Sequence, residues 1–145
     1  MAQQSVLSIT EVAKASIVGY NEKNWDKIRT LLTPGFVYDE VATGRKTKGV
    51  NDTLTLWRGW ATAFPDSKAT FNNEFVSGTT VTLELTWRGT HTGPLQTPNG
   101  EIAPTGKKME LRACQVVEID GDKTSLVRQY FDMATLLRQI GALPG

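Results

Sequence analysis

The stretch Leu85-Thr86-Trp87-Arg88-Gly89-Thr90-His91-Thr92-Gly93-Pro94 decides the fold of this chain and contains its only histidine. From residue 81 to residue 87 every odd position is apolar, and this period of two predicts a strand with one buried face. Gly89 permits a bend or a bulge in that strand. If the register continues past Gly89, His91 lies on the buried face. A buried imidazole costs free energy unless a partner satisfies it, so we expect either a hydrogen-bonded core histidine or a functional one.

Length and composition predict a globular protein with one domain, residues 1–145. The net charge of +1 gives no reason to expect nucleic acid as a partner. No apolar run approaches the roughly 20 residues of a membrane span, and the N-terminus lacks a signal-peptide pattern, so we expect a cytoplasmic protein without a membrane partner. The single Cys114 cannot form an intramolecular disulfide or a thiolate-rich zinc site, and we expect no metal.

The order of predicted elements indicates an α+β fold, because helices dominate the first half and an antiparallel meander the second. The helical ranges are about 5–21, 24–32, 50–63 and 133–140. The strand ranges are 36–40, 68–76, 80–90, 107–119 and 124–131. Segment 42–49 is predicted as a loop. The loop 93–106 is long and rich in Pro and Gly, which suggests a lid or a subunit contact.

Asp132 stands between the last strand and the last helix, and two roles are open to it. Asp is a good N-cap, and a capping carboxylate has a lowered pKa, which does not suit a general acid. Alternation along the strand places Asp132 on the same face as Arg128 and Tyr130. If that face lines a pocket, the carboxyl group can act as acid or base beside a phenol and a guanidinium.

Four aromatic side chains are candidates for the wall of an apolar ligand cavity, because a flat aromatic ligand stacks well on such rings. They are Tyr38, Trp57, Trp60 and Trp87. Core packing is the competing interpretation for each of them. We therefore expect an apolar or aromatic small molecule as the partner.

Several short motifs, taken in order, resemble the SnoaL-like polyketide cyclase family. They are Tyr20-Asn21, Trp25, Leu31-Leu32-Thr33-Pro34, Ala63-Phe64-Pro65-Asp66, Gly89-Thr90-His91-Thr92-Gly93, Pro104-Thr105-Gly106-Lys107, Tyr130-Phe131-Asp132 and Leu136-Leu137-Arg138-Gln139-Ile140-Gly141. The resemblance covers nearly the whole chain. It implies the nuclear-transport-factor-2-like cone, in which a curved antiparallel sheet wraps around three N-terminal helices and a mostly apolar pocket, with a short C-terminal helix.

The resemblance also implies an activity. The characterised cyclases close a ring of a polyketide ester by an intramolecular aldol step without a metal or cofactor. By this resemblance Asp132 is the acid/base and His91 lies in the pocket, where it can donate a hydrogen bond to an oxyanion. Many members also have a histidine in the first strand, and strand 36–40 has none. The fold is usually homo-oligomeric, so we expect a dimer or tetramer.

Three functions therefore compete. The first is a cofactor-free enzyme acting on a polyketide-like or other apolar carbonyl compound, and we favour it. The second is a non-catalytic module that binds a small molecule. The third is a ketosteroid-isomerase-type enzyme or an epoxide hydrolase. An epoxide hydrolase needs paired carboxylates and an arginine around one water, and Asp132, Arg128 and either Asp39 or Glu40 can supply these groups. A cavity that holds both His91 and Asp132 favours an enzyme, and a cavity with neither favours binding alone.

Overall fold

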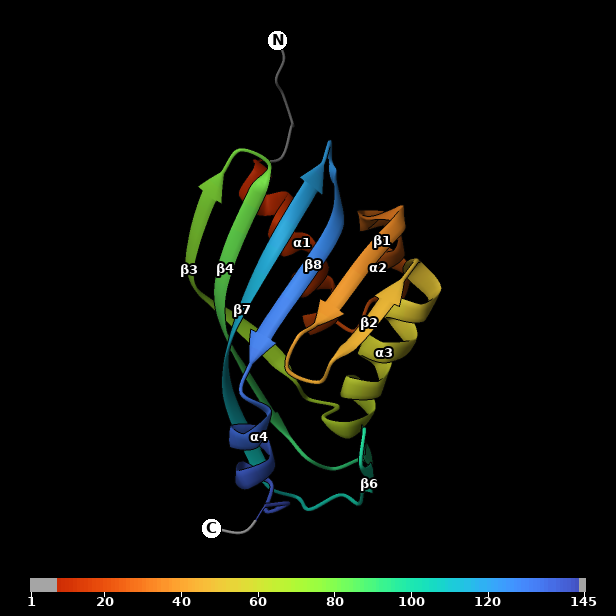
Figure 1. Ribbon diagram of the computed structural model, residues 1–145, viewed down its shortest axis with the longest axis vertical. Coiled ribbons are helices and arrows are strands. Elements are labelled where there is room, and N and C mark those ends of the chain that lie inside the picture. The colour runs from red at the N-terminus through yellow and green to blue at the C-terminus, as the bar shows by residue number, and fades with distance from the viewer. Residues whose placement is uncertain (1–7, 144–145) are drawn as a thin grey trace.

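The computed structural model describes residues 8–143 and shows a curved six-stranded sheet with helices against its concave face (Figure 1). The helices are α1 (Ile9–Asn21), α2 (Trp25–Leu31), α3 (Val50–Ala63) and α4 (Met133–Gln139). The strands are β1 (Leu32–Glu40), β2 (Arg45–Lys48), β3 (Lys68–Ser77), β4 (Thr80–Thr90), β5 (Leu95–Thr97), β6 (Gly100–Ile102), β7 (Lys108–Asp120) and β8 (Lys123–Phe131). The predicted α+β class is confirmed.

The predicted helices form where their capping residues allow. Ser8 begins α1 with a capping box, since its hydroxyl accepts from the Glu11 N–H while the Glu11 carboxylate accepts from the Ser8 N–H. Asn24 caps α2 through the Lys27 N–H. The expected start of the first helix at about residue 5 lies outside the described residues.

The large sheet is mixed, whereas a purely antiparallel sheet was expected. Its strand order is β2-β1-β8-β7-β4-β3, and only the β1–β8 pair among these neighbours is parallel. The chain passes from α2 directly into β1, with Leu32 opposite Thr124 near the beginning of β8. Because both strands begin at the same end of the sheet, β1 runs along β8 and not against it.

The stretch Leu85–Pro94 keeps its pairing register with β7 through Gly89. Strand β4 pairs with β7 without a shift, from Thr80 opposite Glu118 to Thr90 opposite Lys108. His91 continues this ladder, because its N–H donates to the Lys107 carbonyl at 2.8 Å. The odd residues of β4 and β7 therefore face the helices, and His91 is fully buried as its parity predicts.

Two segments that the sequence predicts as loops contain short strands. Strand β2 reads Arg-Lys-Thr-Lys and lies at the edge of the sheet, so its sequence shows no apolar alternation. Strands β5 and β6 have three residues each and form a separate hairpin within loop 93–106. Segments this short carry too little pattern for the period-two signal to predict them.

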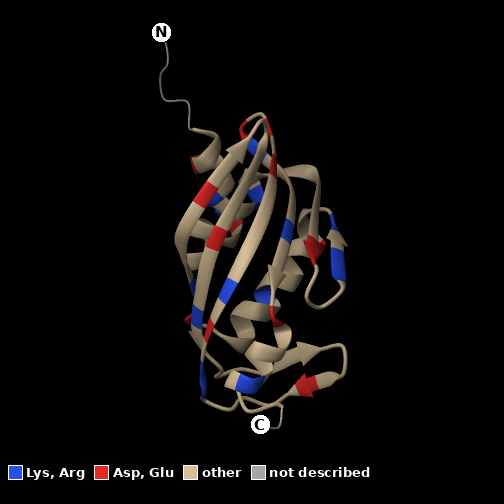
Figure 2. Ribbon diagram, turned by 60° about the vertical axis from the view of Figure 1, so that its left-hand side comes forward, with Lys and Arg blue, Asp and Glu red and all other residues tan. Residues whose placement is uncertain are grey.

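Charged residues of both signs lie on the face of the sheet that points away from the helices (Figure 2). The apolar core fills the opposite side, between the sheet and helices α1 and α3. Among residues 8–143, no helix combines the length and the apolar character needed to cross a membrane.

Candidate functional site

An apolar cavity lies between the concave face of the sheet and helices α1, α3 and α4. Its apolar walls come from Ile17, Trp57, Trp60, Phe64, Trp87, Met109, Leu111, Phe131 and Leu136. Its polar lining comes from Ser16, Tyr20, Tyr38, Ser67, Gln115 and Gln129. Within the described part of the chain, no lining side chain carries a charge at neutral pH. The cavity therefore suits a neutral, mostly apolar molecule with a few hydrogen-bonding atoms.

The cavity is small. The volume open to the centres of water molecules is about 70 Å³. One water needs roughly 10–15 Å³ by this measure, so there is room for about five waters or for one small cyclic molecule. Pockets for drug-sized ligands are roughly 300–1,000 Å³. A larger ligand therefore requires the aromatic walls to move.

Glu40, at the end of β1, is a fully buried carboxylate directly behind the cavity wall. Its Oε2 accepts from the Tyr38 hydroxyl and from the Trp60 indole N–H, both at 2.8 Å. Its Oε1 accepts from the Thr43 hydroxyl at 2.6 Å and from the Arg45 Nη2 at 2.7 Å. Arg45 reaches it because the two residues are direct partners across the β1–β2 hairpin. A buried carboxylate is tolerated only with partners of this kind.

A directed series of hydrogen bonds connects Glu40 to the opposite wall of the cavity. The Gln129 amide donates to the Tyr38 oxygen at 2.7 Å, and Tyr38 in turn donates to Glu40. The Gln129 carbonyl oxygen accepts from the Trp87 indole at 2.9 Å and from the Gln115 amide at 3.0 Å. Burial, and secondly the charge of Glu40, raise the pKa of Tyr38 well above its usual value. The phenol therefore keeps its proton and acts as a donor.

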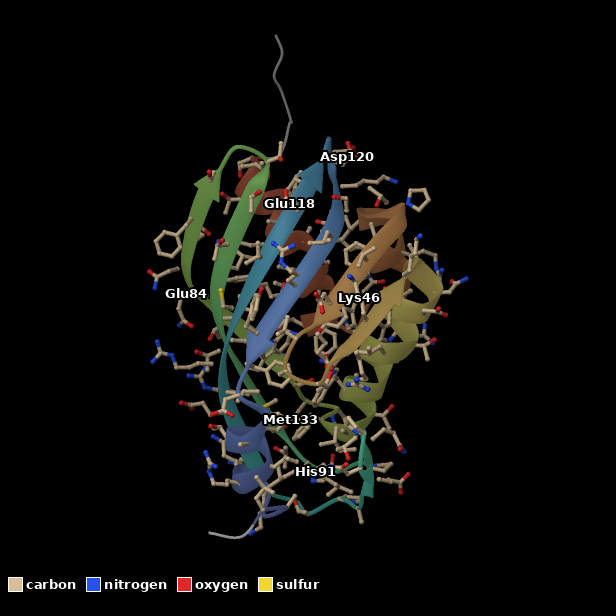
Figure 3. The ribbon with its side chains drawn as sticks, viewed as in Figure 1. Lys46, Glu84, His91, Glu118, Asp120 and Met133 are labelled. Atoms are coloured by element: carbon tan, nitrogen blue, oxygen red, sulfur yellow. The ribbon has the colours of Figure 1, made fainter. Side chains whose placement is uncertain are left out.

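The structure places His91 beside the cavity but not in its lining. Its Nδ1 accepts from the Thr105 N–H at 3.2 Å, which leaves the proton of the neutral ring on Nε2. In the described residues, Nε2 is the one buried side-chain polar atom without a partner. His91 lies at the end of the molecule that carries α4 (Figure 3). The Phe64 ring packs against the imidazole with ring centres 5.3 Å apart and lines the cavity, so it separates the two. Burial lowers the pKa of His91, partly opposed by the Gly93 backbone.

Asp132 is exposed and caps α4, so the expected meeting of His91 and Asp132 inside the cavity does not occur. Its carboxylate accepts from the Thr135 hydroxyl at 2.9 Å and from the Ala134 N–H at 3.0 Å. Hydrogen bonds from Thr135 and then from Ala134 lower its pKa. This is the capping arrangement, one of the two roles that the sequence left open for Asp132.

Arg128 and Tyr130 are corrections to the predicted pocket, because they lie on the outer face of β8 and do not line the cavity. The inner face of β8 is formed by Val127, Gln129 and Phe131. Both faces of this strand carry apolar residues, and the polar Gln129 makes the inner face look like an exposed one in the sequence. Alternation alone therefore did not decide which face points inward.

Tyr38, Trp57, Trp60 and Trp87 all lie in the cavity wall. Tyr38 and Trp57 pack edge to face at 5.4 Å. Whether these rings contact a substrate stays a prediction. The sequence pattern did not predict that Glu40 is buried behind the cavity wall or that Gln115 and Gln129 line it. The signal that could have found them is a polar residue at an inward position of an otherwise apolar strand face.

In the described chain there is no group of three or more His, Cys, Asp or Glu side chains placed to hold a metal ion. The polar groups of the cavity itself are hydroxyls and amides. Such groups bind and orient organic ligands by hydrogen bonding.

Comparisons with known proteins agree with this architecture. The sequence profile of the family described as SnoaL-like polyketide cyclase matches residues 10–140. No curated protein matches the sequence significantly. AclR from Streptomyces galilaeus, proposed to be a hydroxylase, is 20% identical with a TM-score of 0.80, over 97% of this chain and 85% of its own.

Two further solved structures show the same fold. IdmH from Streptomyces antibioticus, proposed to be a polyketide cyclase, is 20% identical with a TM-score of 0.79, over 93% of this chain and 99% of its own. A protein from Catenulispora acidiphila with a ketosteroid isomerase-like fold is 18% identical with a TM-score of 0.77, over 92% and 94% of the two chains. The architecture is thus that of nuclear-transport-factor-2-like proteins.

Proposed function

Because this chain belongs to the SnoaL-like polyketide cyclase family, we propose that it is a small-molecule enzyme that performs cofactor-free acid–base chemistry on a neutral carbonyl compound. The observation that carries the proposal is the uncharged, mostly apolar cavity in which Tyr38 is hydrogen-bonded to the buried Glu40. An aldol closure or a related isomerisation needs such a site, because its substrate is neutral and its protons must be moved away from bulk water.

The Tyr38–Glu40 pair supplies a route for the proton. A carbon next to a carbonyl group loses its proton to the Tyr38 oxygen while Tyr38 passes its own proton to the Glu40 Oε2, 2.8 Å away. The negative charge moves to the substrate enolate and Glu40 becomes neutral. In the second half the transfers reverse, and Tyr38 protonates the new alkoxide. Arg45, bonded to the other Glu40 oxygen, favours the return of the carboxylate charge.

The catalytic roles expected for His91 and Asp132 stay predictions. The Asp132→Asn substitution separates the two roles of that residue, because Asn caps a helix as well as Asp but cannot transfer a proton. If Asp132 only caps α4, this variant keeps its fold and its activity. An inactive but folded variant would assign Asp132 to the reaction after all.

A second candidate function is a binding module without catalysis. It is favoured by the absence of His91, Asp132 and every other carboxylate or imidazole from the described cavity lining. The epoxide hydrolase alternative needs a water held between free carboxylates. Both Glu40 oxygens are already occupied by protein donors, so no observation favours it.

Hydrogen–deuterium exchange separates the enzyme from the binding module. The probe is 2-tetralone, a small neutral ketone with acidic C–H bonds, followed by NMR in D₂O. The enzyme accelerates exchange next to the carbonyl, and Tyr38→Phe reduces that acceleration by about 10²–10⁴-fold. Tyr130→Phe, the same change at an exposed phenol on the outer face, is the matched control and leaves the rate unchanged. Saturable binding of the probe with no accelerated exchange would favour the binding module.

A further inference from the structure

Two hydroxyl groups meet in a second polar part of the cavity, which the Tyr38–Glu40 pair does not use. The Tyr20 hydroxyl, at the end of α1, lies 2.7 Å from the Ser67 hydroxyl, just before β3. Both residues are buried and both line the cavity. Trp87 lies between the two polar parts, because its ring packs on Tyr20 at 5.2 Å while its N–H donates to Gln129.

Neighbouring hydrogen bonds hold the segment that carries Ser67. The Asn21 side chain bonds both the N–H and the carbonyl of Ala69, at 2.8 and 3.0 Å, which joins the end of α1 to β3. The Asp66 carboxylate accepts from the Thr90 N–H at 2.7 Å and from its hydroxyl at 2.8 Å, which joins the same segment to β4. These bonds hold the chain on both sides of Ser67 before any ligand arrives.

A positive charge stands behind the pair. The Lys23 ammonium donates to the Ser67 backbone carbonyl at 2.5 Å and lies 4.5 Å from the centre of the Tyr20 ring. Lys23 has a left-handed backbone conformation with φ 55° two residues after the end of α1. The charge favours negative charge that develops on a ligand oxygen near Tyr20.

One of the two hydroxyl groups of Tyr20 and Ser67 has a hydrogen that bonds to no protein acceptor in the described residues. Each hydroxyl carries one hydrogen, and the bond between the two groups uses only one of them. Residues 8–143 supply neither hydroxyl with a second partner. Burial raises the pKa of Tyr20 to about 12, so the phenol stays protonated near neutral pH. One O–H in the cavity therefore lacks an acceptor that a ligand can supply.

We propose that the Tyr20–Ser67 hydroxyl pair is the subsite that holds the carbonyl oxygen of the ligand, and that the same pair stabilises the enolate oxygen when the proton leaves. The second half of this assignment rests on the proposed function, and the first half does not. The chemical class of the ligand is a neutral ketone or ester with an apolar skeleton. Tyr38 and Glu40 then move the proton, while Tyr20 and Ser67 bind the oxygen.

The test compares 2-tetralone with tetralin, which has the same bicyclic skeleton without the oxygen. Tyr20→Phe and Ser67→Ala each weaken the binding of 2-tetralone by about 3- to 10-fold, the effect of one lost hydrogen bond. Both variants bind tetralin as the wild type does, which also shows that they are folded. Tyr130→Phe is again the matched control for the loss of a phenol oxygen.

A spectroscopic readout addresses the hydrogen bond itself. With ¹³C at the carbonyl of 2-tetralone, the bound signal lies downfield of its position in cyclohexane, and each variant moves it back toward that position. A wild-type signal at the cyclohexane position would overturn the proposal without any variant. An unchanged affinity for 2-tetralone in Tyr20→Phe and Ser67→Ala would also overturn it.

The outcomes for the two proposals are distinguishable. Binding that depends on Tyr20 without accelerated exchange keeps the oxygen subsite and removes the enzymatic function. Accelerated exchange that depends on Tyr38 but is indifferent to Tyr20 and Ser67 keeps the enzyme and removes this subsite.

Discussion

Glu40 shows what one buried charge requires of its neighbours. Its two oxygens accept from Tyr38, Trp60, Thr43 and Arg45, and the carboxylate has no exposed surface. A neutral amide at this position leaves the guanidinium without its negative charge and turns an N–H₂ group toward other donors.

We therefore expect Glu40→Gln to lower the free energy of unfolding by about 3–5 kcal/mol, measured by urea denaturation. Asp39→Asn, the equivalent change one position earlier on the opposite face of β1, is the control and changes stability by less than about 0.5 kcal/mol. Equal effects of the two substitutions would contradict the role given to the Glu40 partners.

The single imidazole gives the molecule a pH dependence. Burial lowers the pKa of His91 in the folded state, so below its unfolded value the unfolded chain binds more protons than the folded chain. Stability therefore falls as the pH drops below the unfolded pKa of about 6.5. His91→Asn keeps an acceptor near the Thr105 N–H and does not titrate.

We expect the melting temperature of the wild type to decrease from pH 7 to pH 5 by more than that of His91→Asn. The measurement is a thermal melt of both proteins across that range. Parallel curves would show that His91 does not titrate on unfolding.

At the scale of elements, Gly93 marks a close approach between the chain after β4 and the end of α3. A Cβ atom at this position would lie 1.9 Å from the Thr62 carbonyl oxygen, so the backbone of α3 would have to move. At Gly59, inside α3, such a Cβ has no atom within 4 Å apart from the adjacent residues and the backbone of its own helix.

We expect Gly93→Ala to destabilise the fold by at least about 1–3 kcal/mol. The same substitution at Gly59 stabilises it by about 0.5–1 kcal/mol, because Ala is the better helix former. Chemical denaturation measures both changes. A neutral Gly93→Ala would mean that α3 can shift without cost.

The sequence predicts the regular elements well and the site only in part, for reasons visible in particular strands. Strands β4 and β7 alternate over most of their length, despite the inward Gln115 and the outward Val116, so their inner faces and the burial of His91 could be predicted. Strand β8 has apolar residues on both faces, so Arg128 and Tyr130 were placed on the wrong side. The Glu40–Trp60 and Tyr20–Ser67 contacts join residues 20 and 47 positions apart in sequence, which no local pattern reveals.

At the scale of the whole molecule, one broad face of the sheet carries no helix of the described chain (Figure 1). Its β7 portion includes the half-buried Cys114, Val116 and Glu118. Homo-oligomerisation, which the family resemblance implies, stays a prediction for this face.

Sedimentation velocity measures the oligomeric state, and we expect a dimer or tetramer. Val116→Lys places a charge in the middle of the face and shifts the protein toward the monomer, whereas Thr55→Lys on the exposed side of α3 does not. A wild type that sediments as a monomer at every concentration would contradict this prediction.

The parallel pairing of β1 with β8 also affects how the protein folds during its synthesis on the ribosome. Tyr38 and its partner Gln129 are separated by 91 positions, so a growing chain that has completed α3 still lacks the strand that completes this wall. Until β8 emerges, the edge of β1 that later pairs with β8 has no partner strand. Its backbone groups then bond to water, and its apolar side chains stay exposed or bind a chaperone. The cavity therefore cannot be complete before β8 and α4 have been made, and a fragment that ends before β8 lacks Gln129, Phe131 and Leu136 of its lining.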